Sequence, residues 1–124
     1  MAHSIHHEHL IKELSELLEP VFKNSPQGVY LYLDDEHKIC NKKFSDMLGY
    51  KSVQEWVDYQ TPISDVLKKD QQKGIDAYYN ASRKLKASTI SVSFVKKNGK
   101  QAKAEIIMVP ISYRGETFVL HFVS

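Results

Sequence analysis

The sequence predicts an α+β fold: a five-stranded antiparallel sheet with helices on one face and an amphipathic N-terminal cap helix. Two observations lead to this prediction. Apolar residues recur at helical spacing in residues 4–19 and in several segments of residues 41–87, whereas residues 29–40 and 88–123 read as strands. The resulting order is one helix, two strands, several helices and three strands, which is typical of antiparallel α+β domains.

Composition places the chain among ordinary globular domains. Its 124 residues suit one domain, and its hydrophobic (42%) and charged (26%) fractions argue against a disordered chain. The net charge of +2 gives no electrostatic reason to expect a nucleic-acid partner. A single cysteine rules out an internal disulfide, and no apolar run reaches membrane-spanning length. We therefore expect a cytoplasmic domain without direct membrane contact.

The first segment, residues 1–19, is predicted to be an amphipathic helix that precedes the main domain at residues 20–124. Ser4 is a candidate N-cap, and Pro20 ends the helix or begins a second short turn. A lone helix of this length is marginal in water, so its leucines must pack on the chain's own sheet, on a second copy, or on both. We expect the chain to form a homodimer through this helix, and the candidate contact residues are Leu10, Leu14, Leu17 and Leu18.

Two strand-like runs, VYLYLDD and HKIC, form a predicted hairpin, and a short helix follows it directly. Asn41 is suited to cap this helix, because its side chain can accept from a free N–H of the first turn. Phe44, Met47 and Leu48 share one helical face, and Gly49 can take the left-handed conformation that ends a helix.

The middle of the chain carries three more helix signals. Ser52 and Glu55 form a capping-box pattern, and Thr61 with Pro62 marks another helix start. Asp70 is a candidate cap for a longer helix. The predicted apolar stripe of that helix consists of Ile75, Tyr78, Tyr79 and Leu85.

The last third changes to strand periodicity. Ile90, Val92 and Phe94 alternate along one face, and Asn98-Gly99 is a strong hairpin signal. Pro110 indicates an edge or a bulge in the next strand. A Gly-containing turn then leads to a final strand, TFVLHFV.

In order and spacing, residues 18–124 resemble the PAS domain family. The family's first half reads as a strand, an acidic turn, a second strand, N-x-x-F and Gly-Tyr, and its second half contains a K-[DN]-G hairpin and a last strand after a short turn. The matching residues here are Pro26-Gln27-Gly28-Val29, Asn41, Phe44, Gly49-Tyr50, Lys97-Asn98-Gly99 and the closing run YRGETFVLHFVS. Within this pattern we interpret Asn41 as the joint between the hairpin and the helices.

The resemblance implies a sensory module of signal transduction, including two-component systems. PAS modules bind a small molecule between sheet and helices, or dimerise, and pass a change to an attached or partner output domain through terminal helices. The alternative is a ligand-free PAS module that only dimerises or docks a partner. No catalytic motif is present, so we do not expect an enzyme, although a longer parent protein would be able to carry a histidine kinase or cyclase domain.

Candidate ligand-pocket residues are Cys40, Met47, Trp56, Tyr78 and Tyr79, although plain core packing is the favoured interpretation of such side chains. No cofactor is expected. The resemblance associates flavin photosensing with a cysteine after the Gly-Tyr, and residues 51–88 contain none. It associates haem with a histidine on the long helix, and residues 70–88 contain none. We interpret His121 as a surface or packed imidazole.

Four histidines crowd the N-terminus: His3, His6, His7 and His9. His3 and His7 have the i, i+4 spacing that can chelate a transition metal. The favoured interpretation is a frayed terminus that binds metal only adventitiously, because Glu8 is the only carboxylate beside them and no cysteine lies nearby. No metal site is assigned, and the role of the cluster is left open.

Overall fold

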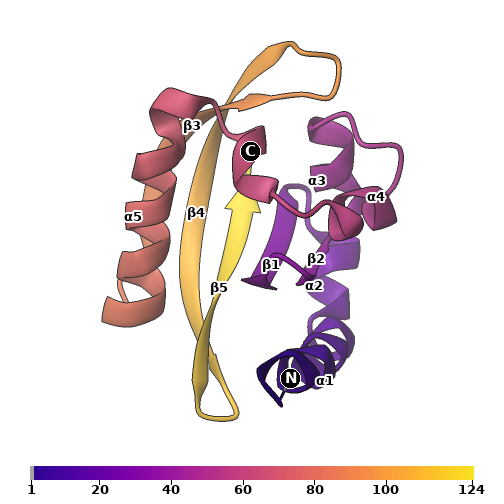
Figure 1. Ribbon diagram of the computed structural model, residues 1–124, viewed down its shortest axis with the longest axis vertical. Coiled ribbons are helices and arrows are strands. Elements are labelled where there is room, and N and C mark those ends of the chain that lie inside the picture. Colours follow the sequence, from indigo (N-terminus) through magenta and orange to yellow (C-terminus); the bar gives the residue numbers. More distant parts are fainter. Residues whose placement is uncertain (1) are drawn as a thin grey trace.

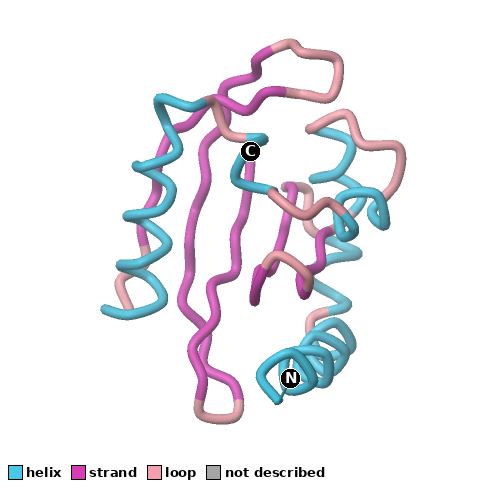
Figure 2. The backbone as a smooth tube through the Cα atoms, in the orientation of Figure 1, coloured by secondary structure: helices cyan, strands magenta, loops and turns pink. Residues whose placement is uncertain are grey.

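The computed structural model describes the backbone of residues 2–124 and the side chains of residues 6–124. One five-stranded antiparallel sheet runs through the molecule in the order β2-β1-β5-β4-β3 (Figures 1 and 2). This confirms the predicted fold class. The strands are β1 (Gly28–Asp34), β2 (His37–Cys40), β3 (Ser88–Val95), β4 (Gln101–Tyr113) and β5 (Glu116–Val123).

Helices cover both faces of this sheet. The N-terminal helices α1 (Ala2–Leu17) and α2 (Glu19–Asn24) pack on one face, and the remaining helices pack on the other. The remaining helices are α3 (Lys42–Met47), α4 (Val53–Asp58), the 3-10 helix η1 (Pro62–Asp65) and α5 (Lys68–Lys84). Across residues 2–124, every helix is too short or too polar to span a bilayer.

Alternation along the central strand divides the core into two parts. Val119 and Val123 of β5 point into the core under α3, α4 and α5, whereas Phe118 and Leu120 point into the core under α1. This follows from strand geometry, since successive side chains leave opposite faces of a sheet. One strand therefore touches both helical layers.

Helix α1 already contains Ser4, so Ser4 is not its N-cap; the side chains of His3, Ser4 and Ile5 lie outside the described set. Of the leucines expected on the dimer face, Leu10 and Leu14 are buried against the chain's own sheet. Leu17 is 62% exposed, and Leu18 follows the helix and is partly buried. The chain's own sheet therefore covers most of the apolar face of α1.

Asn41 makes the hairpin-to-helix joint that the sequence predicts. Its Oδ1 accepts from the backbone N–H of Phe44 (3.0 Å) and of Val29 (2.9 Å), and its Nδ2 donates to the carbonyl of Gln27 (3.0 Å). The Asn41 N–H also donates to the Val29 carbonyl at 3.0 Å. Gly28 lets β1 approach α3 closely, because a Cβ there would lie 3.1 Å from the Phe44 Cα.

The Gly49-Tyr50 pair joins the helices to the β3–β4 hairpin. Gly49 has φ +80°, the left-handed conformation expected just after the end of α3. The preceding Leu48 carbonyl accepts from the N–H of Lys97 at 2.9 Å, and the Lys97 ammonium lies 4.4 Å from the centre of the Tyr50 ring. The Tyr50 hydroxyl donates to Asp65, which anchors η1 as well.

Helix α5 differs from its prediction. It begins at Lys68, and Asp70 does not cap it; instead the buried Asp70 carboxylate accepts from the N–H of Ser93 at 2.8 Å. Ala77 and Ala81 form its buried face, because small side chains let the helix lie close to the sheet. Of the predicted stripe only Tyr78 is partly buried; the exposed members are Ile75, Tyr79 and Leu85.

The other predicted helix starts and the predicted edge proline had different outcomes. Ser52 accepts from the Glu55 N–H at 3.1 Å and caps α4 as predicted. Thr61 makes no side-chain cap bond, although Pro62 does begin η1. Pro110 lies in β4 beyond Met108, where pairing with β3 ends, so it occupies an edge position as predicted.

Asn41→Ala should lower the free energy of unfolding by at least about 2 kcal/mol. Loss of an N-cap costs about 0.5–2 kcal/mol, and each buried backbone group left without a partner adds about 1–3 kcal/mol. Urea midpoints measure the change. Asn41→Ser is the matched control, since serine keeps an N-cap hydroxyl for the first turn of α3 and adds no charge, and it should lose less. Unchanged midpoints for Asn41→Ala would contradict the joint.

Candidate functional site

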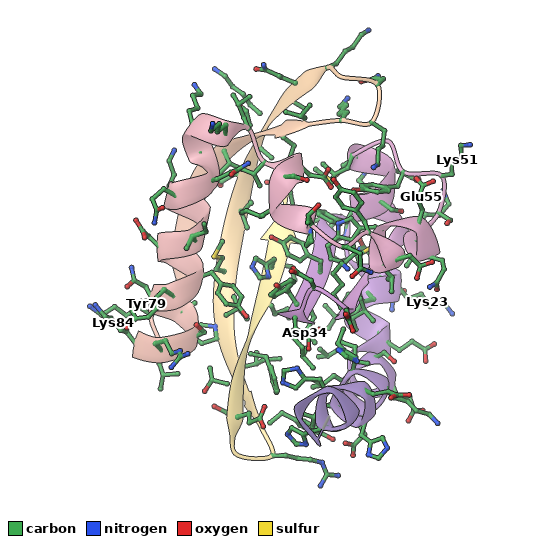
Figure 3. All side chains as sticks on the ribbon, in the orientation of Figure 1. Lys23, Asp34, Lys51, Glu55, Tyr79 and Lys84 are labelled. Atoms are coloured by element: carbon green, nitrogen blue, oxygen red, sulfur yellow. The ribbon has the colours of Figure 1, made fainter. Side chains whose placement is uncertain are left out.

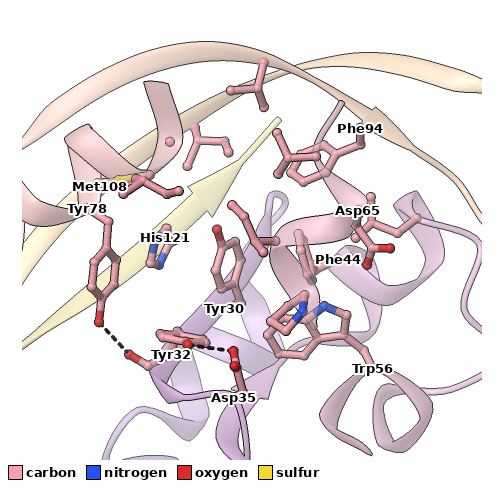
Figure 4. A pocket seen from close by; sticks show the side chains of 18 residues that line it. Tyr30, Tyr32, Asp35, Phe44, Trp56, Asp65, Tyr78, Phe94, Met108 and His121 are labelled. Atoms are coloured by element: carbon pink, nitrogen blue, oxygen red, sulfur yellow. Dashed lines mark hydrogen bonds between the residues drawn. The ribbon is translucent and has the colours of Figure 1, made fainter. Parts of the chain in front are cut away.

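A cavity of about 350 Å³ lies between the sheet and the helices α3, α4, η1 and α5 (Figure 4). Its walls are mostly apolar, which is typical of small-molecule pockets, and a few polar groups lie at defined places on them. The sheet side of the wall consists of Tyr30, Tyr32, Val92, Phe94, Ile106, Met108 and His121. The helix and loop side includes Asp35, Phe44, Leu48, Trp56, Asp65, Val66, Ile75 and Tyr78.

A stack of three rings forms one wall of this cavity. The imidazole of His121 lies almost parallel to the Tyr30 ring, with centroids 4.0 Å apart, and the Tyr78 ring lies parallel to it at 6.0 Å. Figure 4 shows His121 between these two tyrosines, on the last strand. Tyr30 also contacts Phe44 at 4.6 Å between ring centroids. The site is therefore built for contact with a flat apolar surface.

His121 is a polar group of this wall whose Nδ1 lacks a partner. Its side chain is only 2% exposed, and its Nδ1 has no hydrogen-bond partner within the described part of the chain. Burial lowers the pKa of His121 to about 3, although interactions with the backbone of Tyr30 and Val119 oppose the shift. The imidazole is consequently neutral at physiological pH, and its Nδ1 is a buried polar atom without a partner in the described part of the chain.

The charges at the cavity are negative. Asp35 and Asp65 line it, and its lining residues include no lysine or arginine. Burial raises the pKa of Asp65, and the hydrogen bond from Tyr50 and the nearby charge of Lys97 oppose that rise. Such a wall gives no compensation for the desolvation of an anionic ligand.

The β1–β2 turn closes one end of the cavity. The Tyr32 hydroxyl donates to the Asp35 carboxylate at 2.7 Å. The buried ammonium of Lys38 donates to the carbonyls of Asp35 (2.5 Å), Val57 (2.8 Å) and Tyr59 (2.7 Å). Burial lowers the pKa of Lys38, while the carboxylates of Asp35 and its neighbours oppose this. The turn is thereby fixed to the C-terminal end of α4, where a cation is favourable.

The structure brings together only part of the predicted pocket set. Trp56 and Tyr78 line the cavity. Cys40 and Met47 belong to the core outside its walls, and burial raises the pKa of the Cys40 thiol to about 12. Tyr79 is 55% exposed and points away from the sheet beside Lys84, so its assignment to the pocket is corrected (Figure 3). The helical spacing of the apolar residues in 75–85 does not show which of Tyr78 and Tyr79 faces the cavity.

The predicted structural motif contributes one residue to the cavity, Phe44, while Asn41 and Gly49 hold the frame around it. Sequence analysis missed Tyr30, Tyr32 and His121 as wall residues. A signal for the two tyrosines was present, since residues at i and i+2 of a strand share a face. His121 was interpreted as surface or packed, and it is packed.

Acid should destabilise the fold through His121. Because its pKa is lower in the folded state than when unfolded, its neutral form stabilises the fold above about pH 6.5, and that stability is lost as pH falls towards about 3. We expect a loss of about 2 kcal/mol between pH 7 and pH 5.

Urea unfolding at the two pH values measures this loss. His121→Phe keeps the ring stack and removes the titrating group, so its stability should fall much less over the same interval. Equal losses for the two proteins would show that His121 does not titrate as its burial requires.

The fold is identified by its similarity to solved structures, because the sequence comparisons found no match. No protein-family model matches the sequence, and no curated protein matches it either. Similarity appears among solved structures. A PAS domain of an HTR-like protein from Haloarcula marismortui is 21% identical with a TM-score of 0.63, and the match covers 94% of this chain and 95% of that one.

Two further structures agree. A PAS domain from a two-component sensor histidine kinase has a TM-score of 0.66 at 15% identity, with 91% of this chain and 97% of that chain covered. A LOV protein from Rhodobacter sphaeroides has a TM-score of 0.72 at 15% identity, with 91% and 66% covered. At these identities the likeness establishes the architecture. Together with the Asn41 joint and the 2-1-5-4-3 strand order, it shows that the chain has the PAS fold.

Proposed function

We propose that this chain is a sensory module that binds a small, uncharged, largely aromatic molecule carrying a hydroxyl or N–H group. The observation that supports the proposal is the cavity of about 350 Å³, whose lining residues include His121 with its buried and unpartnered Nδ1. A buried polar atom without a partner costs free energy, and a ligand that supplies a hydrogen bond removes this cost.

The wall also limits the charge of the ligand. Asp35 and Asp65 would repel a carboxylate or phosphate, and among the described residues no lysine or arginine lines the cavity to pair with one. The ring stack of Tyr30, His121 and Tyr78 favours a flat, apolar partner. A hydroxyl is a suitable polar group, because it can donate to or accept from the neutral imidazole.

A ligand in the cavity would change the packing on the other face of the sheet. His121 faces the cavity, while its neighbour Leu120 packs in the core that contains Leu10 and Leu14 of α1. Tyr30 and Leu31 on β1 have the same relation. A small shift of these two strands would change the packing of α1, which we propose as the route to an attached or partner output domain.

The alternative function is ligand-free dimerisation, as the likeness to PAS modules also allows. The observation that favours it is Leu17, which is 62% exposed at the end of α1. Leu10 and Leu14 are occupied by the chain's own sheet, so a contact between copies would rest on Leu17 and the partly buried Leu18. Burial of Leu17 would contribute roughly 1.5–3 kcal/mol before the cost of association.

Phenol should raise the thermal midpoint of the chain, and toluene and benzoate should raise it much less. The three probes share one ring: toluene lacks the hydroxyl that would reach His121, and benzoate adds the negative charge that Asp35 and Asp65 oppose. At a phenol concentration of 100 times its dissociation constant the stabilisation is about 2.7 kcal/mol. Thermal unfolding with each probe measures the effect.

The control is His121→Phe, in which phenol should lose its advantage over toluene while the fold is kept. Equal protection by benzoate and phenol would contradict the proposed polarity of the site. Protection by none of the three, together with native mass spectra free of any retained molecule, would favour the ligand-free alternative.

If α1 joins two copies, Leu17→Glu should halve the molar mass in solution. Leu85→Glu is the matched control, since Leu85 is similarly exposed at the end of α5 and should leave the mass unchanged. Light scattering at high protein concentration measures both. A wild-type chain that is already a monomer there would rule out the dimer.

A further inference from the structure

A cluster of metal-ligating side chains lies outside the cavity, where α1 meets the β1–β2 hairpin. It consists of His7 from α1, Asp34 at the end of β1 and His37 at the start of β2, whose ligand atoms all lie within 4.8 Å of one another. The His7 Nδ1 is 2.6 Å from the Asp34 Oδ2, and the His37 Nδ1 is 2.8 Å from the Asp34 Oδ1. We propose that these three residues bind a divalent transition-metal ion, for which Zn²⁺ is the reference probe.

The donor set fits this class of ion. Two imidazoles and one carboxylate suit Zn²⁺, Co²⁺, Ni²⁺ and Cu²⁺, whereas Mg²⁺ and Ca²⁺ prefer oxygen ligands alone. Ligand atoms of a tetrahedral zinc site lie about 3.4 Å apart, given Zn–N and Zn–O distances near 2.1 Å. The histidine–carboxylate separations of 2.6–2.9 Å would need to widen by about 0.5–0.8 Å, and all the ligand atoms already lie within 4.8 Å of one another.

The cluster is also held in place by its surroundings. The Asp34 Oδ1 accepts from the backbone N–H groups of Glu36 and His37, both at 2.8 Å, which fixes the carboxylate within the hairpin turn. In the structure the Nδ1 atoms of His7 and His37 face the same carboxylate, so on binding an ion these hydrogen bonds would be replaced by bonds to the ion and the Nδ1 protons would be given up.

A second carboxylate lies behind one of the ligands. The Nε2 of His7 is 3.9 Å from the Glu116 Oε2, on the side of the ring away from Asp34. When Nδ1 of a neutral histidine binds a metal, its proton resides on Nε2, and a carboxylate there orients the ring and makes it more basic. Glu116 would have to approach by about 1 Å to take that role, and its other carboxylate oxygen accepts from the His6 Nε2 at 2.5 Å.

This site departs from what the sequence alone indicates. The i, i+4 spacing pairs His7 with His3, whose side chain lies outside the described residues, and the structure adds a contact of His7 with the hairpin, where its side chain is 7% exposed. An ion bound there would fasten α1 to the strand that ends beside Asp35 and the cavity. The inference rests on the cluster itself and does not depend on a ligand in the cavity.

Isothermal titration of the full chain with Zn²⁺ tests the proposal. We expect one saturable site per chain, with no comparable binding of Mg²⁺. Replacement of His3, His6 and His9 together by alanine should leave this site intact. His37→Ala and Asp34→Asn should each weaken it at least tenfold, and Glu116→Gln by about tenfold. Asp34→Asn keeps an oxygen acceptor for the turn, so it separates lost ligation from a lost hairpin.

Co²⁺ provides a readout on the unmodified chain. Histidine-bound Co²⁺ in a low-coordinate site gives stronger visible absorption than the hydrated ion, and this band should disappear in His37→Ala. Three results would overturn the proposal: no saturable binding to the wild-type chain, undiminished binding by His37→Ala, or loss of binding when only His3, His6 and His9 are replaced. The last would assign the ion to the terminal histidines.

Discussion

The side chain of Asn41 holds the two halves of this fold together. It is 6% exposed and makes three hydrogen bonds at once, to the backbones of Gln27, Val29 and Phe44. One end of β1 is thereby fixed to the first turn of α3, and Phe44 is directed towards Tyr30 and Trp56. Because those three rings form part of the cavity wall, the frame and the site depend on the same residue.

The second organising feature is a sheet that is covered on both faces. Each central strand alternates between the cavity side and the α1 side, so a displacement of β1 or β5 cannot be confined to one layer. The hairpin end adds a further link, since Asp34 contacts His7 of α1 while the adjacent Asp35 faces the cavity. The N-terminal helix is therefore connected to the site through packing and through polar contacts.

The architecture was largely accessible from sequence because its signals are local. The Asn41 cap, the Gly49 stop and the Asn98-Gly99 turn each depend on a few neighbouring residues, and all three occur in the structure. The site was less accessible. Helical period alone did not show which of Tyr78 and Tyr79 faces inward, and the rotation of α5 is set by Ala77 and Ala81 against the sheet. Contacts such as those of His7 with Asp34 and Lys38 with Val57 join distant segments and leave no local pattern.

The central claim is that the cavity and α1 respond to each other across the sheet. Amide hydrogen exchange on the full chain, with and without saturating phenol, tests it most directly. If the two layers are coupled, exchange should slow around His121 and Tyr30 on the cavity strands and should also change at Leu10 and Leu14 of α1. A response confined to the cavity strands, with α1 unchanged, would contradict the coupling.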